Sequence, residues 1–214
     1  MREEKVLIPS GEIELAGLLG HQEGLRSKGG VVLCHPHPQY GGDMHNPVIM
    51  AALEAASQEG FSTLRFNFRG VGESEGSYGD GIGEREDVKA AIDYLFPRLE
   101  DSHLSLILLG YSFGAWASLP IAVEDSRIEG LVGIAPPLEL YDFRFLQKCK
   151  KGKLFIAGSQ DLFCPAPVLE AWFSGLEEPK SLNIVPEADH FFFSHTQSLI
   201  PPLREFFRMK NSQP

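Results

Sequence analysis

Short apolar runs alternate with longer, partly polar segments along most of the chain, from residue 30 onward. Continuous apolar runs of this kind are typical of strands that are buried on both faces of a parallel sheet. Strands are therefore expected at residues 30–35, 63–68, 104–109, 131–135, 154–157 and 182–185. Before them, residues 4–8 and 12–19 are expected to form two antiparallel strands joined by a turn at Pro9-Ser10-Gly11.

Between the strands, apolar residues recur at helical spacing, for example at Val48, Ala51, Ala52, Ala55 and Ala56. Helices are expected at residues 48–56, 84–95, 115–123, 140–149, 166–176 and 199–207. This alternation predicts an α/β fold, with a doubly wound, mostly parallel sheet of about eight strands and helices on both faces. The 214 residues contain no internal repeat and no long linker, so residues 1–214 are expected to be one domain.

The charge balance argues against a nucleic-acid partner. The chain has 19 Lys and Arg against 29 Asp and Glu, and a formal net charge of −10. A polyanion requires a basic face, and the short lysine group at residues 148–153 is better explained as a cationic helix end.

Two further features indicate a cytoplasmic protein. Neither a signal peptide nor an apolar run of the roughly 20 residues that span a bilayer is recognisable in the sequence. Cys34, Cys149 and Cys164 are odd in number and lack metal-site or disulfide spacing, which is typical of reduced, buried thiols. The oligomeric state stays open.

One motif carries the chemistry. The run Gly110-Tyr111-Ser112-Phe113-Gly114 fits the pattern GxSxG, and it stands between the expected strand 104–109 and the expected helix 115–123. In that setting the serine lies on a sharp turn with its hydroxyl exposed, whereas the alternative is a serine in an ordinary surface turn. Because a serine hydroxyl is a poor nucleophile by itself, it needs a base and a group that orients the base. Ser112 is the expected nucleophile.

Its partners are expected at the ends of later strands. Asp161 follows the strand 154–157 and His190 follows the strand 182–185, in the order Ser, Asp, His that this fold uses. The carboxyl ends of parallel strands converge at one edge of the sheet, where active sites gather. Asp189 and His195 are the rival acid and base. Asp189 is less favoured because a carboxylate seldom reaches its neighbour's ring, and His195 because it stands in the expected start of a helix.

Backbone N–H groups are expected to stabilise the oxyanion. One belongs to Phe113, the residue after the nucleophile, and the other to the loop at residues 35–42. Pro36 and Pro38 have no N–H, so His37 between them is the expected second donor. In the alternative, this is a rigid turn whose N–H points elsewhere.

Taken together, these residues resemble the α/β-hydrolase superfamily, and in particular its small lidless branch near the dienelactone hydrolases, over nearly the whole chain. The run from Asn67 to Ser74 looks like the superfamily's Arg-Gly-x-Gly-x-Ser loop, which is generally structural there. Two departures stand out: His35-Pro36 replaces the His-Gly of many relatives, and the nucleophile is serine where dienelactone hydrolases have cysteine.

The resemblance implies a site without a cap, because the residues between Ala135 and Leu154 suffice for a single helix where larger relatives insert a lid. The pocket is then open, or roofed by short loops. A set of aromatic residues near the site either lines an acyl groove or belongs to the core. These residues are Tyr40, Tyr111, Phe113, Phe163, Phe191 and Phe192.

The sequence thus predicts a serine hydrolase that cleaves small-molecule carboxylic esters, with short or exposed acyl groups, through an acyl-serine intermediate and without a cofactor or metal. A thioesterase, amidase or peptidase would use the same residues. A binding protein that keeps the fold without turnover is a further alternative. A metal hydrolase is the last, because His35, His37, Asp43 and His45 are ordinary zinc ligands.

Overall fold

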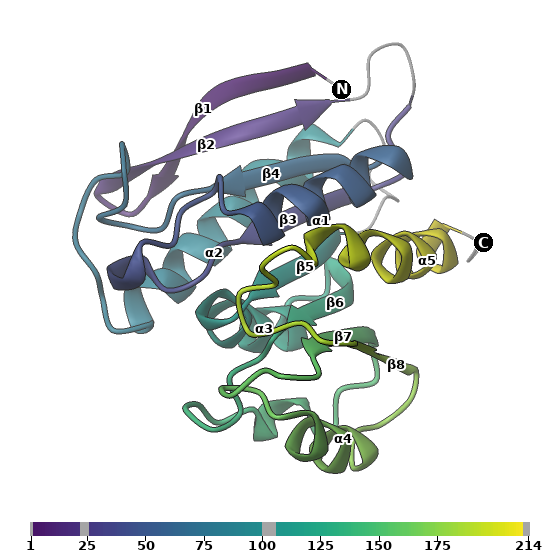
Figure 1. Cartoon of the computed structure of the whole chain (residues 1–214). Coiled ribbons are helices and arrows are strands. Elements are labelled where there is room, and N and C mark those ends of the chain that lie inside the picture. The colour runs from purple at the N-terminus through teal and green to yellow at the C-terminus, as the bar shows by residue number, and fades with distance from the viewer. Residues whose placement is uncertain (1, 22–25, 100–105, 212–214) are drawn as a thin grey trace.

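The structure is a computed structural model that describes residues 2–21, 26–99 and 106–211. Its centre is an eight-stranded sheet with the order β1-β2-β4-β3-β5-β6-β7-β8 (Figure 1). The strands are β1 (Arg2–Ser10), β2 (Ile13–His21), β3 (Gly30–Cys34), β4 (Ser62–Phe66), β5 (Leu106–Tyr111), β6 (Ile128–Ile134), β7 (Gly152–Gly158) and β8 (Lys180–Val185). β2 pairs antiparallel with β1 and β4. The six strands β4, β3, β5, β6, β7 and β8 run parallel to one another.

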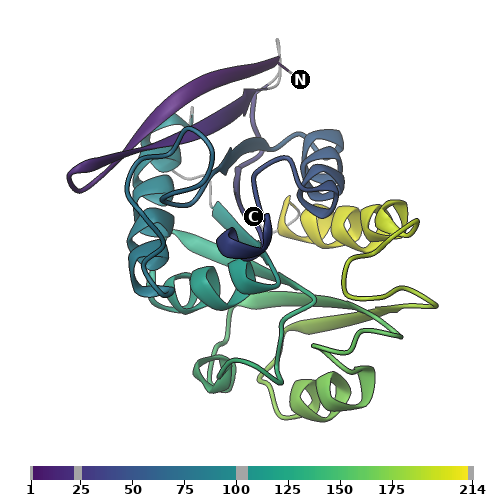
Figure 2. The same ribbon diagram turned by 60° about the vertical axis from the view of Figure 1, so that its left-hand side comes forward.

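Helices cover both faces of this sheet. They are α1 (Pro47–Gln58), α2 (Ile82–Leu95), α3 (Phe113–Glu124), α4 (Ala166–Ser174) and α5 (Ile200–Asn211), with short 3-10 turns η1 (Pro38–Tyr40), η2 (Phe96–Arg98), η3 (Arg144–Leu146) and η4 (Thr196–Leu199). α1 and α5 lie side by side on one face, and α2, α3 and α4 cover the other (Figures 1 and 2). The doubly wound α/β fold expected from the sequence is confirmed.

The central strands are buried along their whole length. Every residue of β3, β4, β5 and β7 is buried, as expected for strands between two helical layers. The helices begin where the sequence offers start signals. Asn46, for example, caps α1 by accepting the N–H of Val48 at 2.9 Å, and Pro47 occupies the first helical position.

The expected helix at residues 140–149 is wrong. This segment forms turns and the short η3, and Phe143, Leu146 and Cys149 are its buried residues. A spacing of three residues matches the 3-10 turn better than the α-helix, so these side chains are buried without a full helix. Asp142 reinforces the turn by accepting the N–H of Arg144 at 2.8 Å.

The first turn also differs from expectation. Pro9 and Ser10 belong to β1, and the chain reverses at Gly11 and Glu12, where Gly11 has a φ of 64°. Ser10 pairs with Ile13 of β2, and its hydroxyl donates to the buried carboxylate of Asp87 at 3.0 Å. Residues 104 and 105, the start of one expected strand, lie outside the described residues.

In the described part of the chain, no helix is both long and apolar enough to cross a lipid bilayer. The segment between β6 and β7 contains η3 and turns in place of a cap, so the expectation of a lidless fold is confirmed.

Candidate active site

Ser112 is the single residue between the end of β5 and the start of α3. Its backbone has φ 53° and ψ −120°, a conformation that L residues rarely adopt. The glycines on either side are required by close packing. A Cβ on Gly110 would overlap the carbonyl oxygen of Gly114, and a Cβ on Gly114 would overlap that of Cys34. The tight approach of strand, helix and neighbouring loop therefore dictates both glycines of the motif and lifts Ser112 to the carboxyl edge of the sheet.

Ser112, His190 and Asp161 form a continuous chain of hydrogen bonds. The Oγ of Ser112 lies 2.9 Å from the Nε2 of His190, and the Nδ1 of His190 lies 2.8 Å from the Oδ2 of Asp161. Because a carboxylate only accepts, the neutral imidazole holds its proton on Nδ1 and presents Nε2 as an acceptor to the serine hydroxyl. The structure therefore brings together the three side chains that the sequence singled out.

The carboxylate of Asp161 is held by its own loop. Its Oδ1 accepts the N–H groups of Phe163 at 2.8 Å and Cys164 at 2.9 Å, which leaves Oδ2 to face His190. This loop is also joined to the one that carries His190. The N–H of Gln160 donates to the carbonyl of Ala188 at 2.9 Å, and a Cβ on Gly158 would overlap that same carbonyl oxygen. Asp161 and His190 are thus positioned as one unit.

Tyr111 holds the backbone of the histidine. Its hydroxyl donates to the carbonyl oxygen of His190 at 2.9 Å, and burial raises the pKa of this phenol, so it stays protonated. Sequence reasoning gave Tyr111 only as one of several aromatic residues near the site. No pattern in the sequence indicates that the residue before Ser112 contacts the loop of His190, because the two residues are 79 positions apart.

The rival acid and base bond elsewhere. The Oδ1 of Asp189 accepts the N–H groups of Phe191 at 3.1 Å and Phe193 at 3.3 Å, and the Nδ1 of His195 donates to the carbonyl of Phe193 at 2.7 Å. Both side chains therefore shape the loop in which they stand.

The side chains of the two residues expected to supply the oxyanion donors lie next to each other. The ring centroids of His37 and Phe113 are 4.7 Å apart, because Gly114 lets the start of α3 press against the backbone at Cys34 and His35. Phe113 is the first residue of α3, and the first N–H groups of a helix have no partner within it. Among the described residues, the structure gives neither the Phe113 nor the His37 N–H a backbone acceptor.

Residues 26–154 match the family model described as serine aminopeptidase S33. A protein of Rickettsia prowazekii is 33% identical over 183 residues, which cover 82% of this chain and 76% of the relative. The chain belongs to this family of α/β serine hydrolases. Residues 137–214 also match a second model, that of the PhoPQ-activated pathogenicity-related proteins.

Solved structures agree with this assignment to the α/β hydrolases. A serine hydrolase homologue from Coxiella burnetii is 32% identical, with 96% of this chain and 97% of that chain covered and a TM-score of 0.88. A serine hydrolase without a lid from Xanthomonas campestris is 29% identical, with 100% and 97% covered and a TM-score of 0.89. The superfamily resemblance seen in the sequence is confirmed.

His35 has a structural place in this α/β hydrolase. Its Nε2 accepts the N–H of Phe68 at 3.0 Å, and its Nδ1 donates to the carbonyl of Pro36 at 2.6 Å. Burial lowers the pKa of this imidazole to about 4, so it is neutral at pH 7. The ring thereby fixes the turn that carries His37.

The candidate metal ligands do not converge. His37 faces the hydroxyl of Tyr78 at 3.3 Å, His45 contacts Arg65 at 2.9 Å, and Asp43 accepts the N–H of His45. His35 is occupied as described above. Within the residues that the structure describes, no group of three or more His, Cys, Asp or Glu side chains could hold a metal ion. The metal-hydrolase alternative therefore lacks its ligand cluster.

The loop from Asn67 to Ser74 is anchored by buried charge. Asp87 on α2 is fully buried and accepts hydrogen bonds from the N–H of Arg69 at 2.9 Å and from its guanidinium at 2.7 Å. These bonds with Asp87 raise the pKa of Arg69. Further along, Glu84 accepts the N–H groups of Gly79 at 2.9 Å and Gly81 at 2.7 Å. The backbone is thus fixed before Tyr78 by Asp87 and after it by Glu84, and Tyr78 contacts His37.

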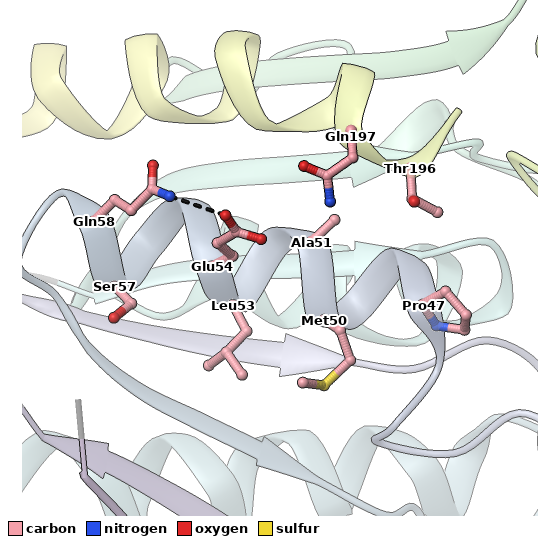
Figure 3. Close-up of a pocket in the computed structure, with 9 residues that line it drawn as sticks. All are labelled: Pro47, Met50, Ala51, Leu53, Glu54, Ser57, Gln58, Thr196 and Gln197. Atoms are coloured by element: carbon pink, nitrogen blue, oxygen red, sulfur yellow. Dashed lines mark hydrogen bonds between the residues drawn. The ribbon is translucent and has the colours of Figure 1, made fainter. Parts of the chain in front are cut away.

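A separate groove of about 390 Å³ runs between α1 and η4 (Figure 3). Ala51 of α1 faces Gln197 across it, whereas the side chains of Met50 and Leu53, which also line it, point away from Gln197 in this view. None of Ser112, Asp161 and His190 lines this groove.

Proposed function

We propose that the protein hydrolyses carboxylic esters with short or exposed acyl groups, with Ser112 as nucleophile, His190 as general base and Asp161 as the group that orients His190. The observation that carries the proposal is the unbroken hydrogen-bonded chain from the Oγ of Ser112 to the carboxylate of Asp161. It stands at a strained backbone position between a strand and a helix, where a nucleophile is fully presented to substrate.

In the first half of the reaction, the Oγ of Ser112 attacks the ester carbonyl carbon and its proton passes to the Nε2 of His190. The N–H groups of Phe113 and His37 stabilise the negative oxygen of the tetrahedral intermediate. As this intermediate collapses, the bond to the alcohol oxygen breaks and that oxygen takes the proton from Nε2. The acyl group stays on Ser112.

In the second half, a water molecule repeats the sequence. His190 takes one proton from the water, the resulting hydroxide attacks the acyl carbon, and Ser112 leaves with the proton held on Nε2. Asp161 keeps the Nδ1 proton in place throughout and stabilises the imidazolium. Every proton and electron pair is returned, so the cycle needs no cofactor or metal.

A peptidase would use the same groups, and the matched family model carries an aminopeptidase description. An aminopeptidase must hold the free ammonium group of its substrate, which requires a carboxylate with a vacant oxygen. Both oxygens of Asp161 are engaged, Oδ1 by the N–H groups of its own loop and Oδ2 by His190, whereas Asp189 uses only its Oδ1. Asp161 is therefore closed to a substrate ammonium group.

The test compares wild type and Ser112→Ala on p-nitrophenyl esters of increasing acyl length, together with labelling by a fluorophosphonate probe. Wild type should label, and its kcat/KM should fall as the acyl chain lengthens. Ser112→Ala should not label, and its kcat should fall by at least about 10³-fold. Ser198→Ala, an exposed serine in η4, is the matched control and should behave as wild type. Equal rates for wild type and Ser112→Ala would contradict the proposal. A folded wild type that neither labels nor turns over would favour the non-catalytic binding protein.

A further inference from the structure

The loops after β7 and β8 turn large aromatic side chains to solvent beside His190. The exposed fractions are 41% for Phe163, 54% for Phe191 and 72% for Phe193. We call these three residues the aromatic rim. Leu162, the neighbour of Phe163, is 84% exposed. Single exposed apolar residues are ordinary, but a contiguous group of them marks a binding surface.

The rim is continuous through the catalytic imidazole. The ring centroid of Phe163 lies 4.8 Å from that of His190. The ring centroid of Phe191 lies 5.5 Å from that of His190, and the two ring planes are perpendicular. Phe193 follows at 5.7 Å from Phe191. A ligand group that leaves His190 in this direction therefore meets aromatic surface at once.

The exposure of these rings is fixed by the backbone. The Oδ1 of Asp161 accepts the N–H of Phe163, and the Oδ1 of Asp189 accepts those of Phe191 and Phe193. Phe192 between them has a φ of 53° and is fully buried, so its two neighbours face outward. Since both loops are already ordered, a ligand on the rim does not bear the entropy cost of arranging them.

The proposed reaction decides which part of an ester meets this surface. His190 must give the Nε2 proton to the leaving oxygen, which therefore lies within about 3 Å of Nε2. The carbonyl oxygen points instead to the N–H groups of Phe113 and His37. The alcohol portion of the ester thus extends past His190, where Phe163 and Phe191 stand, and the acyl portion does not.

We propose that the aromatic rim binds the alcohol portion of the ester and selects large apolar or aromatic alcohols. The inference rests on the proposed function. The exposed side chains next to His190 are those of Leu162, Phe163 and Phe191, which offer apolar contact and no hydrogen-bond partner to a sugar alcohol. Apolar contact of this kind favours bulk without requiring one shape.

The experiment varies the two halves of the substrate separately. One series consists of ethyl, butyl, hexyl and 2-phenylethyl acetates, whose alcohols are similar in acidity. The other consists of ethyl esters of increasing acyl length. Acid release measures kcat/KM for wild type, Phe163→Ala, Phe191→Ala, Phe191→Leu and Phe193→Ser. The readout is the ratio of kcat/KM for 2-phenylethyl acetate to that for ethyl acetate, so that any shared effect on catalysis cancels.

In wild type this ratio should be about 10, and Phe163→Ala or Phe191→Ala should bring it close to 1. Phe191→Leu keeps apolar bulk without the ring and should give an intermediate ratio. Leu7→Ala, which removes an equally exposed apolar side chain on β1, is the matched control and should keep the wild-type ratio. The slope of the acyl series should be the same in all variants.

Three results would overturn the inference. The first is a wild-type ratio near 1 with good turnover of both series, which leaves the proposed function intact. The second is a change confined to the acyl series, which would assign the rim to the acyl group. The third is loss of sedimentation with phosphatidylcholine vesicles in Phe193→Ser without any change in the ratio, which would make the rim a membrane contact. By contrast, a folded wild type that hydrolyses no ester in either series overturns the proposed function itself.

Discussion

The loops on the two sides of Ser112 are stabilised by different kinds of interaction. On the side of His37, buried charge holds them: Asp87 binds Arg69, and Glu84 caps the backbone beside Tyr78. On the side of His190, each carboxylate binds the backbone of its own loop, and phenylalanines turn to solvent. The first side carries the expected oxyanion donors, whose positions must not shift. In the proposed reaction, the second side admits the ester and releases its alcohol.

This difference separates stability from selectivity. Substitutions on the side of His37 should mainly change the free energy of unfolding, because they leave charges buried without partners. Substitutions of exposed side chains beside His190 should change that free energy by only about 0.5 kcal/mol. Their effect should be on the reaction.

The largest effect on kcat is expected for Asp161→Asn. This substitution tests whether the shape of the Asp161 loop can be kept while the proton on the His190 imidazole is moved. The amide oxygen can still accept the N–H groups of Phe163 and Cys164, but the NH₂ group then faces the Nδ1 of His190. The imidazole proton is forced onto Nε2, which can no longer accept from Ser112, and kcat should fall by about 10⁴-fold. Steady-state kinetics and thermal unfolding measure the two consequences.

Asp142→Asn is the control for this change, because Asp142 pairs with Arg144 at the surface. It should leave kcat as in wild type. A kcat for Asp161→Asn within tenfold of wild type would refute the assigned role of Asp161.

The second prediction concerns Asp87→Ala on the side of His37. Removing the carboxylate leaves the hydroxyl of Ser10 and the guanidinium of Arg69 without their partner, so the free energy of unfolding should fall by about 3 kcal/mol. Denaturant unfolding measures it. Asp93→Ala, on the same helix, breaks an exposed pair with Arg127 and should cost less than about 1 kcal/mol. Similar losses for the two variants would remove the contrast between buried and exposed charge.

The third and smallest effect is a pH dependence from His35. Its folded-state pKa of about 4 lies below the ordinary histidine pKa of 6.5, so between these pH values the unfolded chain binds a proton that the folded chain does not. Stability from this residue is complete above pH 6.5 and is lost as the pH falls toward 4. Between pH 7 and pH 5 the loss should be about 2 kcal/mol.

His35→Gln removes this titration. Urea unfolding at both pH values should show a smaller drop in the variant than in wild type. An identical drop in the two proteins would mean that folding does not lower the pKa of His35.

The fold and the proximity of three side chains could be predicted from the sequence, for a physical reason. Buried parallel strands need continuous apolar runs, and the carboxyl ends of such strands meet at one edge, so Ser112, Asp161 and His190 could be predicted from their places after β5, β7 and β8. The structure of residues 140–149 could not be predicted, because the spacing of their buried residues is compatible with turns as well as with a helix.

The aromatic residues near the site could not be sorted either. Tyr111, Phe113 and Phe192 are buried, whereas Tyr40, Phe163 and Phe191 are exposed. In the run Phe191-Phe192-Phe193 the residue type is constant, and only the backbone turn at Phe192 and the hydrogen bonds of Asp189 decide which rings face outward. Such local bonds depend on tertiary contacts that a hydropathy pattern does not encode.

Ser112 adopts a backbone conformation that suits glycine, and a side chain there costs about 1–3 kcal/mol. Heat tolerance and turnover therefore make opposite demands on this position. In a laboratory evolution experiment that selects for folding at high temperature alone, glycine should replace Ser112 early. The selected variants would then be more stable and, in terms of the proposed function, inactive. An engineer who wants a heat-resistant version must screen for turnover in every round, or the gain in stability will come from the loss of the proposed nucleophile.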